Sequence, residues 1–542
     1  MVVDLTNLSV DEARLFESNQ DRVLLDYKEL TEDLLRKSSD LSWLINNVTS
    51  RNTVFSKLLF YMRCERFLNE LSHSQKIEGV KTDDPLLAKL LKEKYIVIFS
   101  GKSVIKGFGI RNVIQCIRWS IGAMFCKSQK RVNVLRQTNG ATIIDTDIAK
   151  KTEKYNDRYY GDVLDSIDEK VTEKFFYNII YLPTPNKKDI DVIDKNTRYH
   201  TIYLWDFLSF GDFFYALRMM LKRDKRRLLN YNYLGINQKP ALEAVYYNNT
   251  SFYYYLAFLY ERVIYRMSKK DIRIRLYVDW YENQSFDKSF CWAMNKFYPE
   301  VEAHSYVGFM ADTKSNPITV PTNTEYELGI APKKIFVCNK ALYDQFIESG
   351  YKGQVVVAPF YRAENIWSIG NINEGFSKFT VLVPLGLNDE EVRYKVQTLN
   401  NLMDSEDELE ILLKPHPVYN CEIIKGILGN ANSIKIVGGN IYDYLPKVNA
   451  VVASNSTTTY ESLALGKPLL YMVDPQMKLA LNKPKNTPED FWYEIRNKES
   501  FDNAIEKIKC LSEGYLKKTG DDLKNYYFTQ NTKELTNKLF AL

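Results

Sequence analysis

The chain has 542 residues, 45% of them hydrophobic, which is enough for at least two packed domains, and its formal charge of +5 is too mild to indicate a nucleic-acid partner. Its longest apolar stretches, such as PLLYMV at 468–473, are far shorter than the roughly 18 residues that span a bilayer, so we expect no transmembrane helix. Seven scattered cysteines without a CxxC pair argue against a disulfide framework and against a zinc site.

The first 90 residues predict a helical segment. They begin MVVDLTNLSVDEARLF, with acidic residues where a secretory signal has a basic region and an apolar core, so we expect a cytoplasmic protein. Further along, the stretches at 107–131 and 218–229 combine basic residues with apolar residues at helical spacing. Each is either an ordinary solvated helix face over a core or a surface for anionic headgroups or an anionic acceptor, and these interpretations stay open.

The rest of the chain predicts two α/β domains. In residues 91–330, strand-like segments at 95–101, 141–146, 175–183, 200–208 and 272–280 alternate with helix-like stretches. In residues 331–542 the alternation is clearer, with strands at 335–338, 355–360, 379–386, 409–414, 433–437 and 450–453. Such alternation is typical of parallel, doubly wound sheets. The predicted fold class is α/β, with two Rossmann-like domains facing a cleft, a helical N-terminal segment and a crossover helix at the very C-terminus.

Two loops of the second domain follow predicted strands, at the edge where open parallel sheets bind ligands. The first reads Lys414-Pro415-His416-Pro417. Its prolines restrict the backbone, so the imidazole is presented at the strand tip beside the charge of Lys414. A histidine in that place can donate a hydrogen bond to a phosphate or to a base carbonyl.

The second loop is rich in hydroxyl groups and stands directly before a predicted helix. It reads Ser454-Asn455-Ser456-Thr457-Thr458. A helix N-terminus presents unpaired N–H groups and a partial positive charge, so hydroxyls at this point suit a phosphate or a ribose. The alternative is a capping box between Thr458 and Glu461, which needs no ligand and would explain one of the hydroxyls.

These two loops resemble known motifs. KPHP at 414–417 and SNSTTTYESLALGKPLLYM at 454–472 are similar to the HP and Ser/Thr motifs of bacterial GT-B glycosyltransferases that use CMP-activated acidic sugars, such as sialyltransferases and Kdo transferases. The resemblance implies a GT-B-like fold and assigns binding of the CMP part of the donor to His416, Ser454, Ser456 and Thr457. More loosely, segments 158–167, 279–290 and 304–309 resemble bacterial O-antigen and surface-carbohydrate biosynthesis proteins. Glycerophosphotransferases of teichoic acid synthesis share an HP motif and a Ser-rich turn, so that alternative stays open.

A transferase of this type uses helix N-termini and basic side chains at the leaving phosphate, and it needs a base or a carboxylate nucleophile for the acceptor hydroxyl. The segment DWYENQSFD offers Glu282, Asp279 and Asp287 for that role, with Asn283 and Gln284 for the acceptor sugar. Alternatively, Glu282 and Asn283 only cap the following helix. The DxD at 145–147 is a very frequent tripeptide, and we expect no metal site from it. Arg362 is a candidate partner for a donor phosphate or carboxylate.

The sequence therefore predicts a glycosyltransferase that moves an acidic sugar, Kdo or another nonulosonate, from a CMP donor to a bacterial surface glycan. Its expected partners are the nucleotide sugar, a glycan or lipid-linked glycan acceptor and the inner membrane surface, with no further cofactor and no nucleic acid. Four alternatives stay open: a UDP-sugar transferase, a CDP-glycerol-type glycerophosphotransferase, a nucleotide-sugar epimerase and a non-catalytic subunit of a polysaccharide assembly complex.

Overall fold

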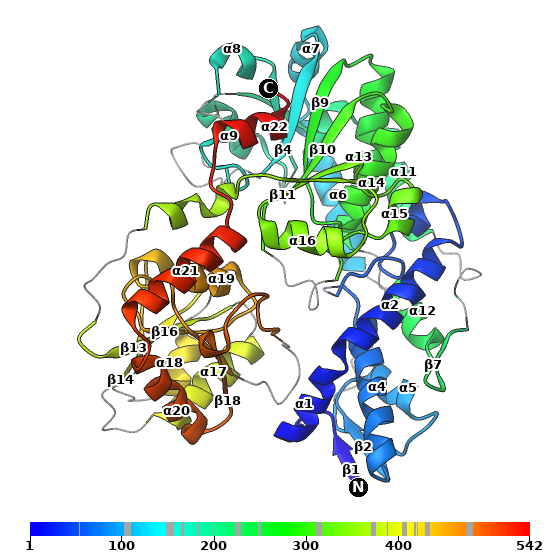
Figure 1. Cartoon of the computed structure of the whole chain (residues 1–542). Helices are drawn as coiled ribbons and strands as arrows, with labels where there is room; N and C mark the ends of the chain where they lie inside the picture. The colour runs from blue at the N-terminus through cyan, green and yellow to red at the C-terminus, as the bar shows by residue number, and fades with distance from the viewer. Residues whose placement is uncertain are drawn as a thin grey trace.

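The computed structural model describes residues 1–53, 55–101, 110–147, 157–163, 167–180, 184–197, 199–222, 228, 230–247, 251–310, 317–369, 376–386, 389–403, 409–416, 419, 421–428, 434–472 and 481–542. Figure 1 shows these residues as an N-terminal unit in blue, a central unit in cyan and green, and a C-terminal unit in yellow and orange. The predicted fold class is confirmed, because two Rossmann-like domains with parallel sheets follow a largely helical N-terminal segment. None of the described helices is long and apolar enough to cross a bilayer.

The N-terminal unit is mostly helical, and it also contains a small parallel sheet. The helices are α1 (Val10–Ser18), α2 (Gln20–Leu35), α3 (Leu41–Leu44), α4 (Leu58–Ser74) and α5 (Pro85–Leu91). The sheet contains β1 (Val2–Asp4), β2 (Gly79–Thr82) and β3 (Val97–Phe99), in the order β1-β2-β3. A later excursion of the chain joins the same core, with β7 (Asn232–Tyr233), β8 (Ile236–Asn237) and α12 (Lys239–Tyr247).

The central unit is built on a seven-stranded parallel sheet. Its strands are β4 (Ala141–Thr146), β5 (Phe175–Ile179), β6 (His200–Tyr203), β9 (Ile274–Trp280), β10 (Glu302–Val307), β11 (Lys334–Val337) and β12 (Gln354–Val357). They lie in the order β12-β11-β10-β9-β4-β5-β6, so the strand order reverses between β4 and β9. The helices of this unit are α6 (Ile110–Phe125), α7 (Gln129–Gln137), α8 (Glu169–Thr172), α9 (Lys187–Asn196), α10 (Leu204–Phe207), α11 (Phe210–Leu221), α13 (Phe252–Lys269), α14 (Ser285–Phe297), α15 (Asn323–Glu327) and α16 (Lys340–Glu348).

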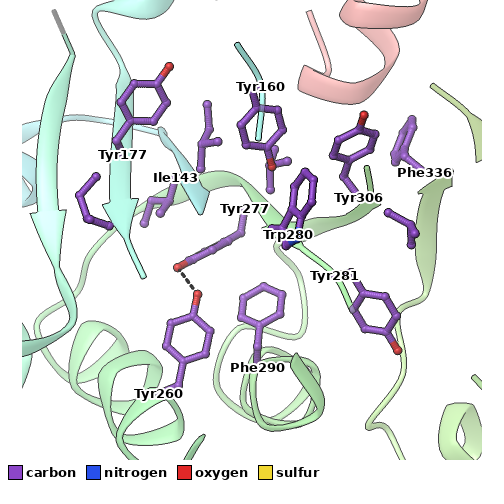
Figure 2. Close-up of a cluster of buried hydrophobic side chains, with 14 of the residues drawn as sticks. Ile143, Tyr160, Tyr177, Tyr260, Tyr277, Trp280, Tyr281, Phe290, Tyr306 and Phe336 are labelled. Carbon is purple, nitrogen blue, oxygen red and sulfur yellow. Dashed lines mark hydrogen bonds between the residues drawn. The ribbon is translucent and has the colours of Figure 1, made fainter. Parts of the chain in front are cut away.

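Aromatic side chains fill the core between this sheet and its helices (Figure 2). Tyr277 of β9 lies 4.8 Å from Phe290 of α14, measured between ring centroids. The hydroxyl of Tyr277 is 2.9 Å from that of Tyr260 on α13. Strand β9 is buried at six of its seven residues, as expected for a strand of a parallel sheet that is covered on both faces.

Three predicted strands lie in a different sheet from the one expected. β11 and β12 pair with β10 and with each other, whereas the sequence placed 335–338 and 355–360 in the C-terminal domain. The boundary between the two large domains therefore follows β12 and does not fall at residue 330. In the same way, residues 95–101 contribute β3 to the N-terminal sheet. An apolar run indicates a strand but says nothing about its pairing partner, which explains these differences.

The C-terminal unit contains a six-stranded parallel sheet. Its strands are β13 (Phe379–Pro384), β14 (Leu409–Lys414), β15 (Ile434–Ile436), β16 (Ala450–Val452), β17 (Leu469–Met472) and β18 (Trp492–Ile495). The order β15-β14-β13-β16-β17-β18 is the 3-2-1-4-5-6 order of a Rossmann fold, with its reversal between β13 and β16. The helices are α17 (Asp389–Leu402), α18 (Glu422–Leu428), α19 (Thr457–Ala464), α20 (Lys498–Lys509) and α21 (Glu513–Tyr527).

The last helix, α22 (Lys533–Phe540), returns to the central unit, as the sequence analysis expected (Figure 1). The Arg275 guanidinium of β9 donates hydrogen bonds to the carbonyls of Ala541 at 2.8 Å and Phe540 at 3.2 Å. The Phe540 ring lies 6.1 Å from that of Phe175 on β5. The two large domains are thus tied together by the chain before β13 and by this returning helix.

Gly466 ends α19 in the left-handed conformation, with a φ of +69°. A Cβ at this position would collide with the Leu516 carbonyl of α21. We expect Gly466→Ala to lower the free energy of unfolding by at least about 1–2 kcal/mol, the cost of the left-handed backbone alone. Urea unfolding of the full chain measures it. The matched control is Gly514→Ala in α21, where no atom lies near the added methyl group and alanine favours the helix. Equal unfolding midpoints for the two variants would refute the role of Gly466.

Candidate functional site

A pocket of about 570 Å³ lies at the carboxyl ends of β13 to β16. Four loops form its walls, and each follows one strand: residues 384–386 after β13, 414–416 after β14, 439–441 after β15, and 454–458 after β16. Because β13 and β16 flank the reversal of strand order, the pocket occupies the place where Rossmann-like sheets bind their ligands.

Most of the predicted donor-binding residues meet in this pocket. The residues that line it are Lys414, His416, Ser454, Asn455, Ser456 and Thr458. Thr457, also predicted, is the first residue of α19 and is half-buried outside the lining. Pro417 lies outside the described residues. The Lys414 side chain is mostly buried, and its Nζ donates to the carbonyl of Pro415 at 3.3 Å.

The hydroxyl-rich turn is folded by its own side chains. The Oγ1 of Thr459 donates to the carbonyl of Ser454 at 2.6 Å and accepts from the N–H of Ser454 at 2.9 Å. The hydroxyls of Ser454 and Ser456 are 2.8 Å apart. Ser456 is the N-cap residue of α19, so these two hydroxyls and that of Thr458 lie at the positive end of the helix dipole.

The capping box between Thr458 and Glu461 is not formed, because α19 begins at Thr457 with Ser456 as its N-cap, two residues earlier than that interpretation requires. Instead, Glu461 accepts a hydrogen bond at 2.6 Å from the hydroxyl of Tyr442, which follows the pocket loop at 439–441. Burial raises the pKa of Glu461, while the bond from Tyr442 and the charge of Arg362 act against this rise. Glu461 thus lies behind the pocket wall and joins two of its loops.

The sequence analysis missed several lining residues. Glu391 of α17 contributes a carboxylate, which accepts from Lys395 Nζ at 2.6 Å, and the same Nζ donates to the Ala453 carbonyl at 3.2 Å. The remaining lining residues are Pro384, Leu385, Gly386, Pro415, Gly439, Asn440 and Ile441. Glycines two residues after a strand end, as in PLG at 384–386 and GGN at 438–440, were the available signal, because they let a ligand approach the backbone closely.

The predicted catalytic carboxylates lie at the other reversal of strand order, between β4 and β9. Asp279 belongs to β9 and is fully buried. Asp287 is also buried, and its Oδ2 accepts from the N–H groups of Glu282 at 3.0 Å and Gln284 at 2.9 Å. Glu282 is only half-buried, and its Oε1 accepts from Trp280 Nε1 at 2.9 Å. Of the three, Glu282 is the one that can reach a bound molecule.

Asp279 belongs to a buried network below this edge. Its neighbour Asp145 on β4 accepts hydrogen bonds from Asn178 at 2.7 Å, from Tyr277 at 3.0 Å and from Tyr260. Asp279 Oδ2 accepts from Ser305 at 3.2 Å. Burial raises the pKa of Asp279 well above its ordinary value, and the charges of Asp287 and Asp145 add to the rise. Burial thus favours the protonated form of Asp279, and we assign it a positioning role beneath this edge.

The raised pKa of Asp279 predicts a pH-dependent stability. The folded chain holds a proton that the unfolded chain releases, so this stabilisation is present at low pH and is lost as pH rises through the raised pKa. We expect Asp279→Asn to make the decline in stability toward alkaline pH shallower, because an amide does not ionise. Urea unfolding midpoints between about pH 5 and about pH 9 measure the slope. The control is Asp162→Asn at an exposed carboxylate, and equal slopes for both variants would contradict the assignment.

The two predicted acceptor-binding residues are used inside the protein. Asn283 is fully buried in the left-handed region, with a φ of +56°. Its Nδ2 donates to the Ile318 carbonyl at 2.8 Å, and its Oδ1 accepts from the Tyr281 hydroxyl at 2.9 Å. Asn283 therefore positions the loop and presents no group to an acceptor. The helix cap is Gln284, whose Oε1 accepts from Asn52 at 2.5 Å, so the alternative that Glu282 and Asn283 cap α14 is wrong.

Arg362 lies between the pocket at the β13/β16 reversal and the carboxylates at the β4/β9 reversal. It is exposed in the 3-10 helix Tyr361–Trp367, which follows β12, and its guanidinium carbon lies 5.7 Å from the centroid of the Trp280 ring. Tyr159 stacks on the same Trp280 at 3.8 Å, and burial together with the charges of Glu282 and Asp147 raises the pKa of Tyr159. On the other side, the charge of Arg362 reaches Glu461 behind the pocket. The guanidinium is therefore placed to contact a molecule that extends from one edge to the other.

Several solved protein structures are similar to this chain in fold. No known family model and no curated protein sequence matches this chain. The UDP-GlcNAc 2-epimerase from Neisseria meningitidis bound to UDP-GlcNAc is 10% identical, with 74% of this chain and 100% of that chain covered and a TM-score of 0.43. A glycosyltransferase from Rickettsia africae is 11% identical over 74% and 97% of the two chains, with a TM-score of 0.41. CalG4, the calicheamicin glycosyltransferase, is 11% identical over 72% and 96%, with a TM-score of 0.38. Identities this low bear on the fold alone.

Proposed function

We propose that this chain is a GT-B glycosyltransferase that transfers an acidic sugar, Kdo or another nonulosonate, from a CMP donor to a bacterial surface glycan. The observation that carries the proposal is the meeting of Lys414, His416 and the hydroxyls at the N-terminus of α19 in one pocket at the β13/β16 reversal. The helix dipole and the Lys414 ammonium counter the charge of the phosphate that leaves with the nucleotide, and the His416 imidazole donates a hydrogen bond to it, a task that other transferases give to a metal ion.

The choice of CMP and of an acidic sugar rests on the resemblance of 414–417 and 454–472 to the HP and Ser/Thr motifs. A UDP-sugar or CDP-glycerol would place its phosphates at the same helix N-terminus, so the identity of the donor is an outcome of the binding experiment. A non-catalytic assembly subunit would have the same fold without turnover.

The acceptor side is assigned to the β4/β9 edge. Glu282 is the proposed general base, because it is the accessible carboxylate of the predicted three and Trp280 fixes its direction. Arg362 is proposed to bind the donor carboxylate or phosphate from the side of Trp280. Asp279 and Asp287 are positioning residues beneath this edge. The proposed acceptor is a glycan or a lipid-linked glycan at the inner membrane face.

Calorimetric titration of CMP, CDP, UDP and GDP tests the donor pocket. We expect one cytidine or uridine nucleotide to bind, and Lys414→Ala and His416→Ala each to weaken that binding by roughly ten- to hundredfold, the value of a hydrogen bond to a charged group. The control is Lys435→Ala, an exposed lysine on β15 that forms an ion pair with Glu410 away from the pocket. If none of the nucleotides binds, or if all three variants bind like the wild type, the proposed pocket is wrong.

A further inference from the structure

Two helices of the central unit present exposed apolar side chains in regular rows. On α6 the row consists of Ile110, Ile114, Ile117, Ile121 and Phe125, a spacing of three or four residues that places them on one helix face. Their exposed fractions run from 43% for Ile114 to 86% for Phe125. On α11, Phe210 and Phe214 are 72% and 66% exposed. Large exposed apolar patches of this kind are a common mark of a surface that binds another protein or a membrane.

The opposite faces of both helices are firmly anchored. Trp119 of α6 packs edge-on against Trp205 at 5.7 Å and against Phe213 of α11 at 6.5 Å. Ser120 is 2.6 Å from the hydroxyl of Tyr255 on α13. Both α6 and α11 contact α13, so they lie side by side in one layer of the central unit. The exposed rows therefore belong to fixed helices and form one outward face, which we call the α6/α11 face.

The charges on this face are positive. Arg111 and Arg118 are exposed on α6 beside the apolar row, and Arg218 and Lys222 are exposed at the end of α11. The one acidic residue of the two helices, Asp212, is buried and forms ion pairs with Arg262 at 2.7 Å and Arg266 at 2.9 Å. The remaining basic residues of the stretch at 218–229, which are Arg223, Lys225, Arg226 and Arg227, lie outside the described residues.

We propose that the α6/α11 face docks on the surface of a bilayer that contains anionic lipids. A helix with such a face lies in the plane of the interface, with its apolar row among the upper acyl chains and its basic residues at the anionic headgroups. A second copy of the chain is the poorer occupant, because a symmetric contact would bring the same arginines against each other. This inference does not rest on the proposed function, because it is argued from the exposed apolar and basic side chains of α6 and α11 alone.

Cosedimentation of the full chain with vesicles tests the proposal. The vesicles contain phosphatidylcholine alone or phosphatidylcholine with phosphatidylglycerol. We expect binding to the anionic vesicles that weakens with added salt. The double variant Phe125→Glu/Phe214→Glu should lose it by roughly tenfold or more, because it removes apolar area and adds repelling charge. Arg111→Gln/Arg118→Gln should weaken it by roughly fivefold for each charge removed.

The matched control is Ile347→Glu, which changes an isoleucine of α16 with 53% exposure outside this face and should bind vesicles like the wild type. Thermal unfolding and nucleotide titration of each variant confirm that it is folded and that a loss of lipid binding is separate from the donor pocket. The proposal is overturned if the wild type does not bind anionic vesicles, or if both double variants bind them as tightly as the wild type does. A wild-type dimer that Phe125→Glu/Phe214→Glu converts to a monomer, without vesicle binding, would assign the face to self-association.

Discussion

Glu282→Gln is expected to lower the kcat of sugar transfer by about 10²- to 10⁴-fold, the usual contribution of a general base, and to leave nucleotide affinity unchanged. The reason lies in the β4/β9 edge. Asp279 and Asp287 are buried there, whereas Glu282 is half-buried and held by Trp280 at 2.9 Å. An amide keeps the hydrogen bond from Trp280 and the shape of the side chain but does not accept a proton from an acceptor hydroxyl.

The rate is measured with the nucleotide sugar that matches the nucleotide bound by the pocket, and the affinity by calorimetry on the same preparation. Glu364→Gln provides the control, because this exposed glutamate lies two residues from Arg362 and carries no proposed role. A Glu282→Gln enzyme with a rate within a few-fold of the wild type would eliminate Glu282 as the base. A variant that loses nucleotide affinity together with the rate would make its role structural.

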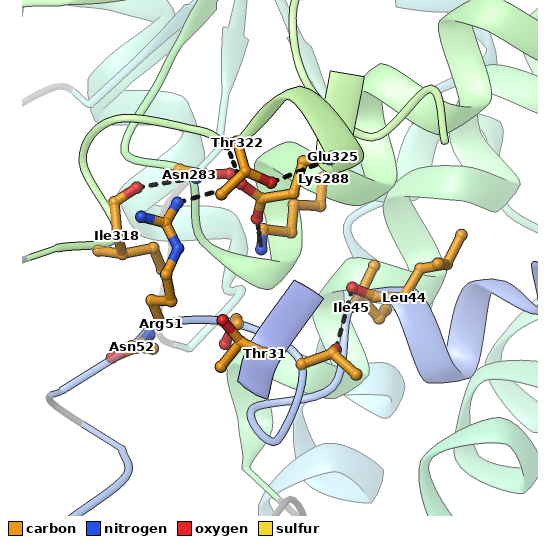
Figure 3. Close-up of polar contacts among 12 residues, drawn as sticks. Thr31, Leu44, Ile45, Arg51, Asn52, Asn283, Lys288, Ile318, Thr322 and Glu325 are labelled. Atoms are coloured by element: carbon orange, nitrogen blue, oxygen red, sulfur yellow. Dashed lines mark hydrogen bonds and ion pairs between the residues drawn. The ribbon is translucent and has the colours of Figure 1, made fainter. Parts of the chain in front are cut away.

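Glu325→Gln is expected to lower the free energy of unfolding by about 3–5 kcal/mol, because it leaves two buried cations without their counter-charge. Figure 3 shows the cluster, in which Glu325 of α15 forms ion pairs with Lys288 of α14 and with Arg51 at 3.2 Å. Lys288 and Glu325 are fully buried, and Arg51 is nearly so. Arg51 also donates to the carbonyls of Pro317 at 2.7 Å and Val320 at 2.6 Å, so the cluster ties the N-terminal unit to the central one.

This destabilisation has a predicted pH dependence. Burial alone would raise the pKa of Glu325, but the charges of Lys288 and Arg51 outweigh burial and hold it at about 2. A lowered pKa means that the stabilisation is full above the ordinary value of 4.5 and is lost as pH falls toward 2. In urea unfolding, the wild type and Glu325→Gln should therefore differ most at neutral pH and converge in acid.

Glu327→Gln is the matched control, since this glutamate of the same helix pairs with Lys352 in solvent. It should unfold at the wild-type midpoint. If Glu325→Gln also unfolds there, the buried cluster contributes nothing to the attachment of the N-terminal unit.

The sequence predicted strands that consist largely of apolar and β-branched residues. ATIIDT at 141–146 is β4 with the expected limits, whereas β13 ends at Pro384, two residues before the expected limit of 386. Both are visible in the sequence because buried parallel strands are rich in apolar and β-branched residues. β10 is not visible in the same way, since its EAHSYV contains polar residues. One of them, His304, has a local and a distant partner: Nε2 pairs with Glu302 of the same strand at 2.7 Å, and Nδ1 pairs with the Leu539 carbonyl of α22 at 2.5 Å. A partner 235 positions away has no local signature.

Site residues could be predicted where their role is visible from the residues next to them in the sequence. His416 and Ser456 are found in the pocket because a histidine between prolines and a hydroxyl at a helix start are visible in a few residues of sequence. Asn283 was misplaced because a polar residue after a strand looks the same whether it faces a ligand or, as here, the Ile318 carbonyl. Glu391 was missed because its place in the pocket depends on α17 packing beside β16, where Lys395 bonds to Ala453.

The central claim is that the pocket at the β13/β16 edge holds the phosphate of a nucleotide donor. A crystal structure of the full chain with the nucleotide that binds most tightly in calorimetry tests it most directly. The account predicts the phosphate at the N-terminus of α19, within hydrogen-bond distance of the Ser454 or Ser456 hydroxyl and of Lys414 or His416. A nucleotide found elsewhere, with the turn at 454–458 empty, would contradict the donor site and the transferase assignment that depends on it.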